Sequence, residues 1–173
     1  MADVPDQLVL KVARDREGRR DVVARRFGLS ALLVLLALGV LNLFGQRPAT
    51  TSADAEAARL EVYAPERVRG GLYYEARFRI DAVRELDNAT LVLDPGWAEG
   101  ITINTVEPSP LGEASRDGKL AFELGRVPAG QKHLFFLHLQ VNPTNVGHRS
   151  QDVQLFDGDE LLATVDRTIT VFP

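Results

Sequence analysis

The stretch 72–82, LYYEARFRIDA, carries the pattern that decides the fold class. Every second residue is apolar: Leu72, Tyr74, Ala76, Phe78 and Ile80. The residues between them are mostly charged. Because successive side chains of a β-strand point to opposite faces of a sheet, this alternation predicts a strand with one buried face and one solvated face.

Similar apolar runs recur on both sides of this stretch. They cover residues 59–63, 89–93, 101–106, 119–124, 132–141, 152–156 and 161–172. Turn-forming sequences separate many of them, such as Asp94-Pro95-Gly96, Asp117-Gly118 and Asp157-Gly158. Seven or eight short strands without an amphipathic helix predict an all-β, antiparallel β-sandwich, with a closed barrel as the alternative.

A long apolar segment precedes the predicted strands. Residues 27–44, FGLSALLVLLALGVLNLF, contain no charge, and as a helix they would extend about 27 Å, close to the thickness of a bilayer core. Basic residues lie mainly before the segment, with Arg47 alone close after it. Those before it are Arg14, Arg16, Arg19, Arg20, Arg25 and Arg26. The positive-inside rule therefore predicts a transmembrane helix with a cytosolic N-terminus in the plasma membrane.

Two alternatives to a transmembrane anchor stay open. A cleaved signal peptide would fit Ala53-Asp54-Ala55 as a small-x-small cleavage site, and Arg25-Arg26 resembles a twin-arginine signal. The apolar run is longer than a usual signal core, and the alanine pair lies well beyond its end, which favours the anchor. A buried core helix is the third reading, but the segment lacks a polar face.

These features divide the chain into four parts. We expect a cytosolic Arg-rich tail (1–26), a transmembrane helix (27–46), a flexible stalk (47–57) and an extracytoplasmic domain (58–173). From residue 47 onward, 13 basic residues face 19 acidic ones, which argues against nucleic acid as a partner. The chain has no cysteine, so disulfides, thiolate metal sites and thiol nucleophiles are excluded.

The stretch 88–130 carries a resemblance to a known family. A strand leads into Asp94-Pro95-Gly96-Trp97, a second strand follows, and a glycine corner, Leu124-Gly125-Arg126-Val127-Pro128-Ala129-Gly130, precedes the long apolar strand 133–141. This order resembles the bacterial immunoglobulin-like (Ig-like) conserved-repeat domains of cell-surface proteins, over roughly residues 58–173. The resemblance implies an Ig-like β-sandwich that acts as a structural or binding module. This chain carries a single copy on an N-terminal anchor, whereas such repeats are commonly found in tandem.

The side chains that could perform chemistry form no convincing catalytic or metal site. His133 and His138 are five residues apart on a predicted strand, so they should point to opposite faces. His148, Ser150 and Asp152 could be imagined as a hydrolase triad, but no Gly-x-Ser-x-Gly turn is present. Copper transfer needs soft sulfur ligands, and the only sulfur-containing residue is Met1. We therefore predict no catalytic residue, no metal and no cofactor.

The acidic sequence 157–160, Asp-Gly-Asp-Glu, has two readings. It lacks the spacing of a calcium-binding loop, and Asp-Gly between two strands is already explained as a hairpin turn. We expect the hairpin.

One strand offers a candidate partner surface. In 132–141, the residues Phe135, Leu137, Leu139 and Val141 share one face and should enter the core. Leu134 and Phe136 are apolar on the opposite face, beside His138 and Gln140. That face is either covered by a loop or exposed and adhesive. If it is exposed, the candidate partner-binding residues are Tyr73, Leu134, Phe136 and His138.

The leading functional hypothesis is a non-enzymatic interaction module of the bacterial envelope, tethered to the lipid bilayer. It would serve as an accessory or assembly subunit of another envelope or membrane protein, with no small-molecule substrate. The first alternative is a transmembrane signal relay that links the outer domain to the basic tail. The second is an envelope hydrolase that uses His148, Ser150 and Asp152.

Overall fold

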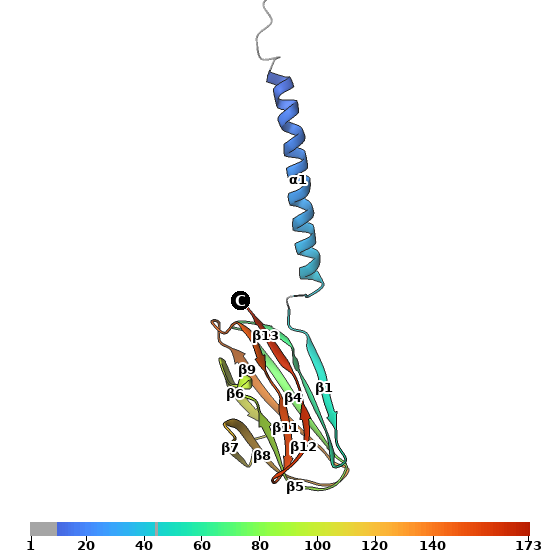
Figure 1. Ribbon diagram of the computed structural model, residues 1–173, viewed down its shortest axis with the longest axis vertical. Helices are drawn as coiled ribbons and strands as arrows, with labels where there is room; N and C mark the ends of the chain where they lie inside the picture. Colours follow the sequence, from blue (N-terminus) through green and yellow to red (C-terminus); the bar gives the residue numbers. More distant parts are fainter. Residues whose placement is uncertain (1–9, 44) are drawn as a thin grey trace, which may run out of the picture. The chain divides into compact units, whose positions relative to one another are not determined.

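The computed structural model describes the backbone of residues 10–43 and 45–173, and the side chains of residue 18 and of residues 20–43 and 45–173. The chain forms two compact units, Met1–Leu43 and Phe44–Pro173 (Figure 1). The first contains one long helix. The second is built mainly from antiparallel strands.

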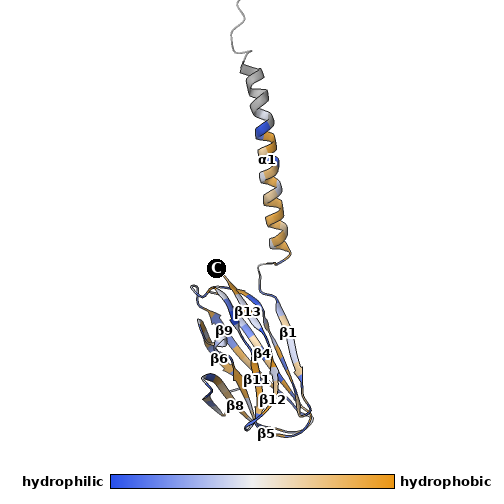
Figure 2. Ribbon diagram, viewed as in Figure 1, coloured by the Kyte–Doolittle hydropathy of each residue, from blue (hydrophilic) through white to orange (hydrophobic). Residues whose placement is uncertain are grey.

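Helix α1 spans Leu10–Val40. Its part from Arg20 to Val40 is long and apolar enough to cross a membrane, although a signal sequence near the N-terminus has the same features. Figure 2 shows the change from the polar start of this part to the apolar remainder. The helix begins well before the predicted 27–46 segment and ends before its last six residues.

The end of α1 has a defined local cause. Asn42 adopts a left-handed backbone with φ 52°. The amide of Leu43 donates to the carbonyl of Leu38 (3.1 Å), and the amide of Asn42 donates to the carbonyl of Gly39 (2.9 Å). This hydrogen-bond pair is the Schellman motif, in which a residue that tolerates the left-handed conformation satisfies the last helix carbonyls.

Three sheets make up the second unit. Sheet A contains, in spatial order, β1 (Pro48–Asp54), β2 (Ala58–Pro65), β4 (Tyr73–Ala82), β9 (Lys132–Val141) and β6 (Ile101–Glu107). Sheet C contains β12 (Glu160–Val165), β11 (Val153–Asp157), β5 (Leu86–Leu93), β8 (Lys119–Val127) and β7 (Gly112–Arg116). Sheet B contains β10 (Gly147–Ser150), β13 (Thr168–Phe172) and β3 (Arg67–Arg69), of which β13 and β3 pair in parallel. A single 3₁₀ turn, η2 (Pro95–Trp97), follows β5.

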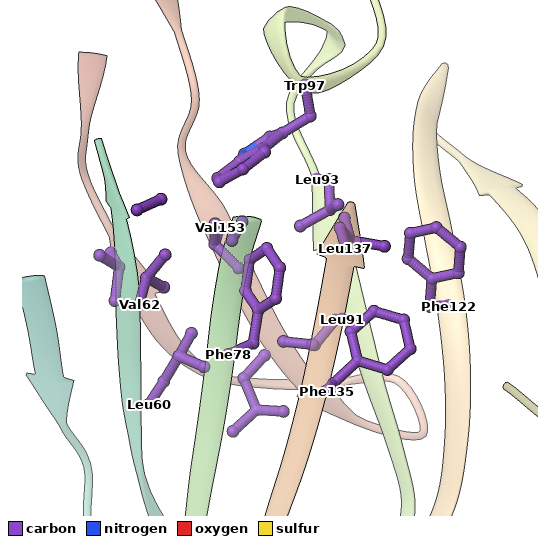
Figure 3. Packing of buried hydrophobic residues seen from close by; sticks show 14 of the residues in the cluster. Leu60, Val62, Phe78, Leu91, Leu93, Trp97, Phe122, Phe135, Leu137 and Val153 are labelled. Atoms are coloured by element: carbon purple, nitrogen blue, oxygen red, sulfur yellow. The ribbon is translucent and has the colours of Figure 1, made fainter. Parts of the chain in front are cut away.

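Apolar side chains from all three sheets form one core cluster. Figure 3 labels members of this cluster from sheets A and C, together with Trp97. At its centre the ring of Phe78 lies 5.2 Å from Trp97 and 6.0 Å from Phe135, and Phe135 lies 5.1 Å from Phe122. The pairs are tilted, an arrangement that aromatic rings favour over a face-to-face sandwich. The predicted inward faces of 72–82 and 132–141 are confirmed by the burial of Tyr74, Ala76, Phe78 and Ile80 and of Phe135, Leu137, Leu139 and Val141, whereas Leu72 lies outside β4 and is exposed.

The predicted class, antiparallel and mostly β, is confirmed, but the predicted number of strands is wrong. The described residues contain thirteen strands rather than seven or eight. Some are short, and the single run 161–172 is split into β12 and β13 by Asp166 and Arg167.

The expected flexible stalk at 47–57 is also corrected. Residues 48–54 form β1, which pairs antiparallel with β2 from Pro48↔Pro65 to Asp54↔Arg59. Ala53 and Ala55 are partly buried against the core. An edge strand pairs with one neighbour through its backbone, so polar and small side chains are enough to form it.

A buried polar cluster marks the place where the chain passes between sheets. Arg167 lies between β12 and β13 and is only 6% exposed, and its Nη2 donates to the carbonyls of Ala64 (3.2 Å) and Pro65 (3.3 Å) at the end of β2. Gln151 lies between β10 and β11, and its backbone amide donates to the backbone carbonyl of Arg167 (2.9 Å). Trp97 Nε1 in turn donates to the carbonyl of Gln151 (3.0 Å). These contacts join four places where the chain passes from one sheet to another: the end of β2, the turn η2, and the connections at Gln151 and Arg167.

Candidate interaction surface on sheet A

The outward face of sheet A carries a row of aromatic and arginine side chains. Strand pairing places Tyr63 of β2 opposite Arg77 of β4, and Arg77 opposite Phe136 of β9. The guanidinium carbon of Arg77 lies 5.4 Å from the centroid of each ring. Arg77 is therefore held between two aromatic rings, within the range of a cation–π interaction.

Glu75 tethers the same arginine from its own strand. Arg77 Nη2 lies 3.4 Å from Glu75 Oε1. The two side chains are 46% and 40% exposed, so solvent screens this ion pair and it contributes little to stability. Glu75 therefore gives the guanidinium of Arg77 a third neighbour beside the two aromatic rings.

A second group of charges lies farther along the same face. Arg79 donates to Asp81 (2.7 Å) and lies 3.8 Å from Glu61 Oε1, and Lys132 approaches Asp81 at 4.0 Å. The hydrogen bond from Arg79 holds the pKa of Asp81 below its ordinary value. The two cations and two carboxylates of this group balance in charge. The surface that remains for a partner is therefore the aromatic and aliphatic part of the face.

All four predicted partner-binding residues lie on this outward face. Tyr73 is 65% exposed and Leu134 is 43% exposed, while Phe136 and His138 are half-buried. His138 pairs across the sheet with Glu75, and Tyr73 pairs with Gln140 two residues away, at the start of β4. We name the set Tyr63, Tyr73, Arg77, Leu134 and Phe136 the sheet A patch.

Two members of the sheet A patch were not predicted from the sequence. Tyr63 and Arg77 belong to different strands, and only the register between β2, β4 and β9 brings them beside Phe136. The alternation within 72–82 already placed Arg77 on the outward face. No local signal fixed its neighbours, because register is a property of the pair and not of either strand.

The sequence matches no protein-family model and no curated protein.

The three residues of the alternative hydrolase hypothesis each form a hydrogen bond outside the trio. His148 Nδ1 lies 2.9 Å from Thr170 Oγ1, and Ser150 Oγ donates to Asp94 Oδ2 (2.7 Å). The carboxylate of Asp152 accepts from the backbone amide of Arg167 (2.8 Å). The nucleophile–base–acid chain that a triad requires is not formed by these residues.

The two histidines of β9 point to opposite faces of sheet A, and the acidic sequence 157–160 lies at a hairpin. His133 is half-buried and has a buried, unpartnered Nε2, whereas His138 faces outward from sheet A. Among the described residues, no group of three or more His, Asp or Glu side chains is placed to hold a metal ion. Gly158 and Asp159 form the turn between β11, which ends at Asp157, and β12, and Gly158 has φ 58°.

The topology arginines are only partly described. Arg20, Arg25 and Arg26 lie in α1, and all three are exposed. The backbone of Arg14, Arg16 and Arg19 is also helical, but their side chains lie outside the described residues.

Proposed function

We propose that this chain is a non-enzymatic, membrane-anchored interaction module. Helix α1 would span the plasma membrane with its N-terminus in the cytosol. The β unit, an Ig-like sandwich in this proposal, would stand outside and present the sheet A patch to an envelope or membrane protein that the chain serves as an accessory subunit. The observation that carries the proposal is the row Tyr63–Arg77–Phe136 on an outward sheet face.

The composition of the sheet A patch supports a protein partner. Tyrosine, arginine and phenylalanine are enriched in protein interfaces, where a few such residues carry most of the binding free energy. Tyr73 and Leu134 offer exposed apolar surface, and Arg77 is held in place before any partner arrives. A preformed arginine loses less conformational entropy when it binds.

The pairing of β1 supports an anchor that stays attached. The small-x-small sequence 53–55 would be the cleavage site of a signal peptide, yet Ala53 lies in β1 and packs against the core together with Ala55. Cleavage after Ala55 would remove the whole of β1, which pairs along its entire length with β2. Intact-mass measurement of the membrane-extracted protein should give the full 19.0 kDa chain.

Paired variants test the partner surface. The double variant Tyr73→Ala/Leu134→Ala removes two exposed side chains of the sheet A patch, and Leu111→Ala/Leu161→Ala removes two exposed side chains elsewhere. Purification of the full chain in mild detergent should recover a stoichiometric membrane protein. We expect the first variant to weaken that association about 30-fold or more, as loss of a binding hot spot does, and the second to leave it unchanged.

Two outcomes would contradict the proposal. One is repeated recovery of the chain alone from membranes. The other is a partner that both double variants retain equally or lose equally. Orientation is tested separately by adding protease to spheroplasts, which should digest the β unit and spare the N-terminal tail.

A further inference from the structure

The outward face of sheet B differs in charge from the rest of the β unit. In β3 the buried Val68 lies between exposed Arg67 and Arg69, so both arginines point to the same, outward face. Their pairing partners on β13 are Thr170 and Phe172. The face therefore carries two cations beside a hydroxyl and an aromatic ring.

These two arginines are also the ones left without a carboxylate partner. Within residues 48–173, every other exposed or half-buried lysine and arginine has a carboxylate oxygen within 4.0 Å. Arg167 is buried and donates to backbone carbonyls. Arg67 and Arg69 thus form the one uncompensated cationic pair in this part of the chain, in a unit whose acidic residues outnumber its basic ones.

The neighbours of the pair suit a negatively charged oxygen ligand. Thr170 Oγ1 lies 2.9 Å from His148 Nδ1, and both residues belong to the same outward face. The flanking carboxylate is Glu66, which also acts electrostatically on the buried Arg167. A guanidinium offers two parallel N–H donors to a phosphate, so two arginines two residues apart can engage one or two phosphate groups.

The position of β3 along the chain points to lipid phosphate as the ligand. Residues 41–47 connect the end of α1 to β1, and seven residues span at most about 25 Å. Pro48, at the start of β1, pairs with Pro65, and Arg67 follows two residues later. In addition, Gln46 Nε2 donates to the carbonyl of Tyr73 (2.9 Å). The two arginines therefore belong to the part of the β unit to which the connection is joined.

We infer that Arg67 and Arg69 bind the headgroup phosphates of anionic lipids and so orient the β unit on the membrane surface. This inference rests on the proposed anchor. An acidic unit is repelled by an anionic surface. A single basic face reverses that repulsion in one orientation only, which would fix the direction in which the sheet A patch points.

The test uses the full chain reconstituted in vesicles. Because the protein has no cysteine, Thr168→Cys places one donor dye on the outward face of sheet B. Energy transfer to a headgroup-labelled lipid is compared in phosphatidylcholine and in phosphatidylcholine with about 30% phosphatidylglycerol. We expect higher transfer in the anionic vesicles and a loss of that increase as salt is added.

Two charge-matched variants locate the effect. Arg67→Gln/Arg69→Gln should abolish the response to lipid charge, since each arginine near an anionic surface strengthens binding about fivefold, or about 25-fold for the two together. Arg59→Gln/Arg126→Gln removes the same net charge from other strands and should keep the response. Equal transfer in both lipids, or equal loss in both variants, would overturn the inference.

Flotation separates failure of this inference from failure of the anchor. Carbonate-resistant flotation with neutral vesicles reports the anchor alone. If the chain floats with anionic vesicles only, and only with Arg67 and Arg69 intact, the lipid site stands and the anchor fails. If the two arginines affect recovery of an acidic protein but not the vesicle signal, the ligand is that protein and the lipid inference is wrong.

Discussion

Replacement of Phe78 by alanine tests the aromatic packing at the centre of the β unit. Phe78 is fully buried and contacts both Trp97 and Phe135. Truncation of a buried phenylalanine to alanine costs about 3–5 kcal/mol, because transfer free energy is lost and a cavity remains. For a unit of about 130 residues, a loss of about 4 kcal/mol lowers the melting temperature by about 15 °C.

Trp97 provides the assay. It is the only tryptophan in the chain and is fully buried, so its fluorescence reports unfolding of the β unit and not of α1. Thermal unfolding of the full chain in mild detergent should show the emission of Trp97 moving to longer wavelength at the lowered midpoint. The heat-induced change should remain cooperative.

A surface variant and a conservative variant serve as controls for Phe78→Ala. Tyr73→Ala removes an aromatic ring that is mostly exposed and should change stability by about 0.5 kcal/mol or less, or about 2 °C. Phe78→Leu keeps most of the volume and should fall between the two. A melting-temperature loss below about 5 °C for Phe78→Ala, or an equal loss for Tyr73→Ala, would refute the assignment of this ring to the centre of the core.

Three further predictions concern titration and backbone conformation. Burial raises the pKa of Tyr74 to about 12, so this phenol ionises at lower pH in the unfolded chain than in the folded one. The free energy of unfolding should therefore fall by about 2–3 kcal/mol as the pH rises from 10 to 12. Denaturant titrations of Tyr74→Phe, which leaves Gln151 Nε2 without its phenol partner, should lack this fall. Burial lowers the pKa of His133 below 6.5, so the stability that its neutral form contributes is present above pH 6.5 and is lost as the pH falls below that value. The melting temperature of His133→Leu should therefore depend less on pH in the acid range. Identical pH profiles for the variant and the parent chain would count against a buried, neutral His133. Gly125 has φ 79°, and Gly125→Ala should cost about 1–2 kcal/mol in chemical denaturation; the new Cβ also meets Leu111, so adding Leu111→Ala should restore part of the loss.

The sequence predicted most strands that have an apolar face and missed four strands at sheet edges. Strands β1, β3, β7 and β10 all lie at an edge of their sheet. An edge strand pairs with one neighbour and can be short or polar, so it leaves a weak periodic signal. The polar composition of residues 48–54 is therefore as typical of a flexible linker as of an edge strand.

The sequence predicted the residues of the sheet A patch that the pattern of a single strand reveals, but not their neighbours on other strands. Leu134 and Phe136 stood out because they interrupt the alternation of a strand whose other face was already apolar. The contact of Arg77 with both rings depends on the register of three strands, which turns and core packing set together. The buried Arg167 was missed for a similar reason: its acceptors, the carbonyls of Ala64 and Pro65, lie about a hundred residues earlier in the chain.

The pairing of β1 also decides how the β unit should be produced without its helix. A recombinant fragment that begins at Ala58, the first residue after the apparent linker, would omit β1 and leave the backbone groups of β2 open along one side. Such a bare strand invites pairing between molecules, so the shortened fragment should self-associate in solution. A fragment that begins at Gly45 keeps the ladder complete and should stay monomeric at the same concentration.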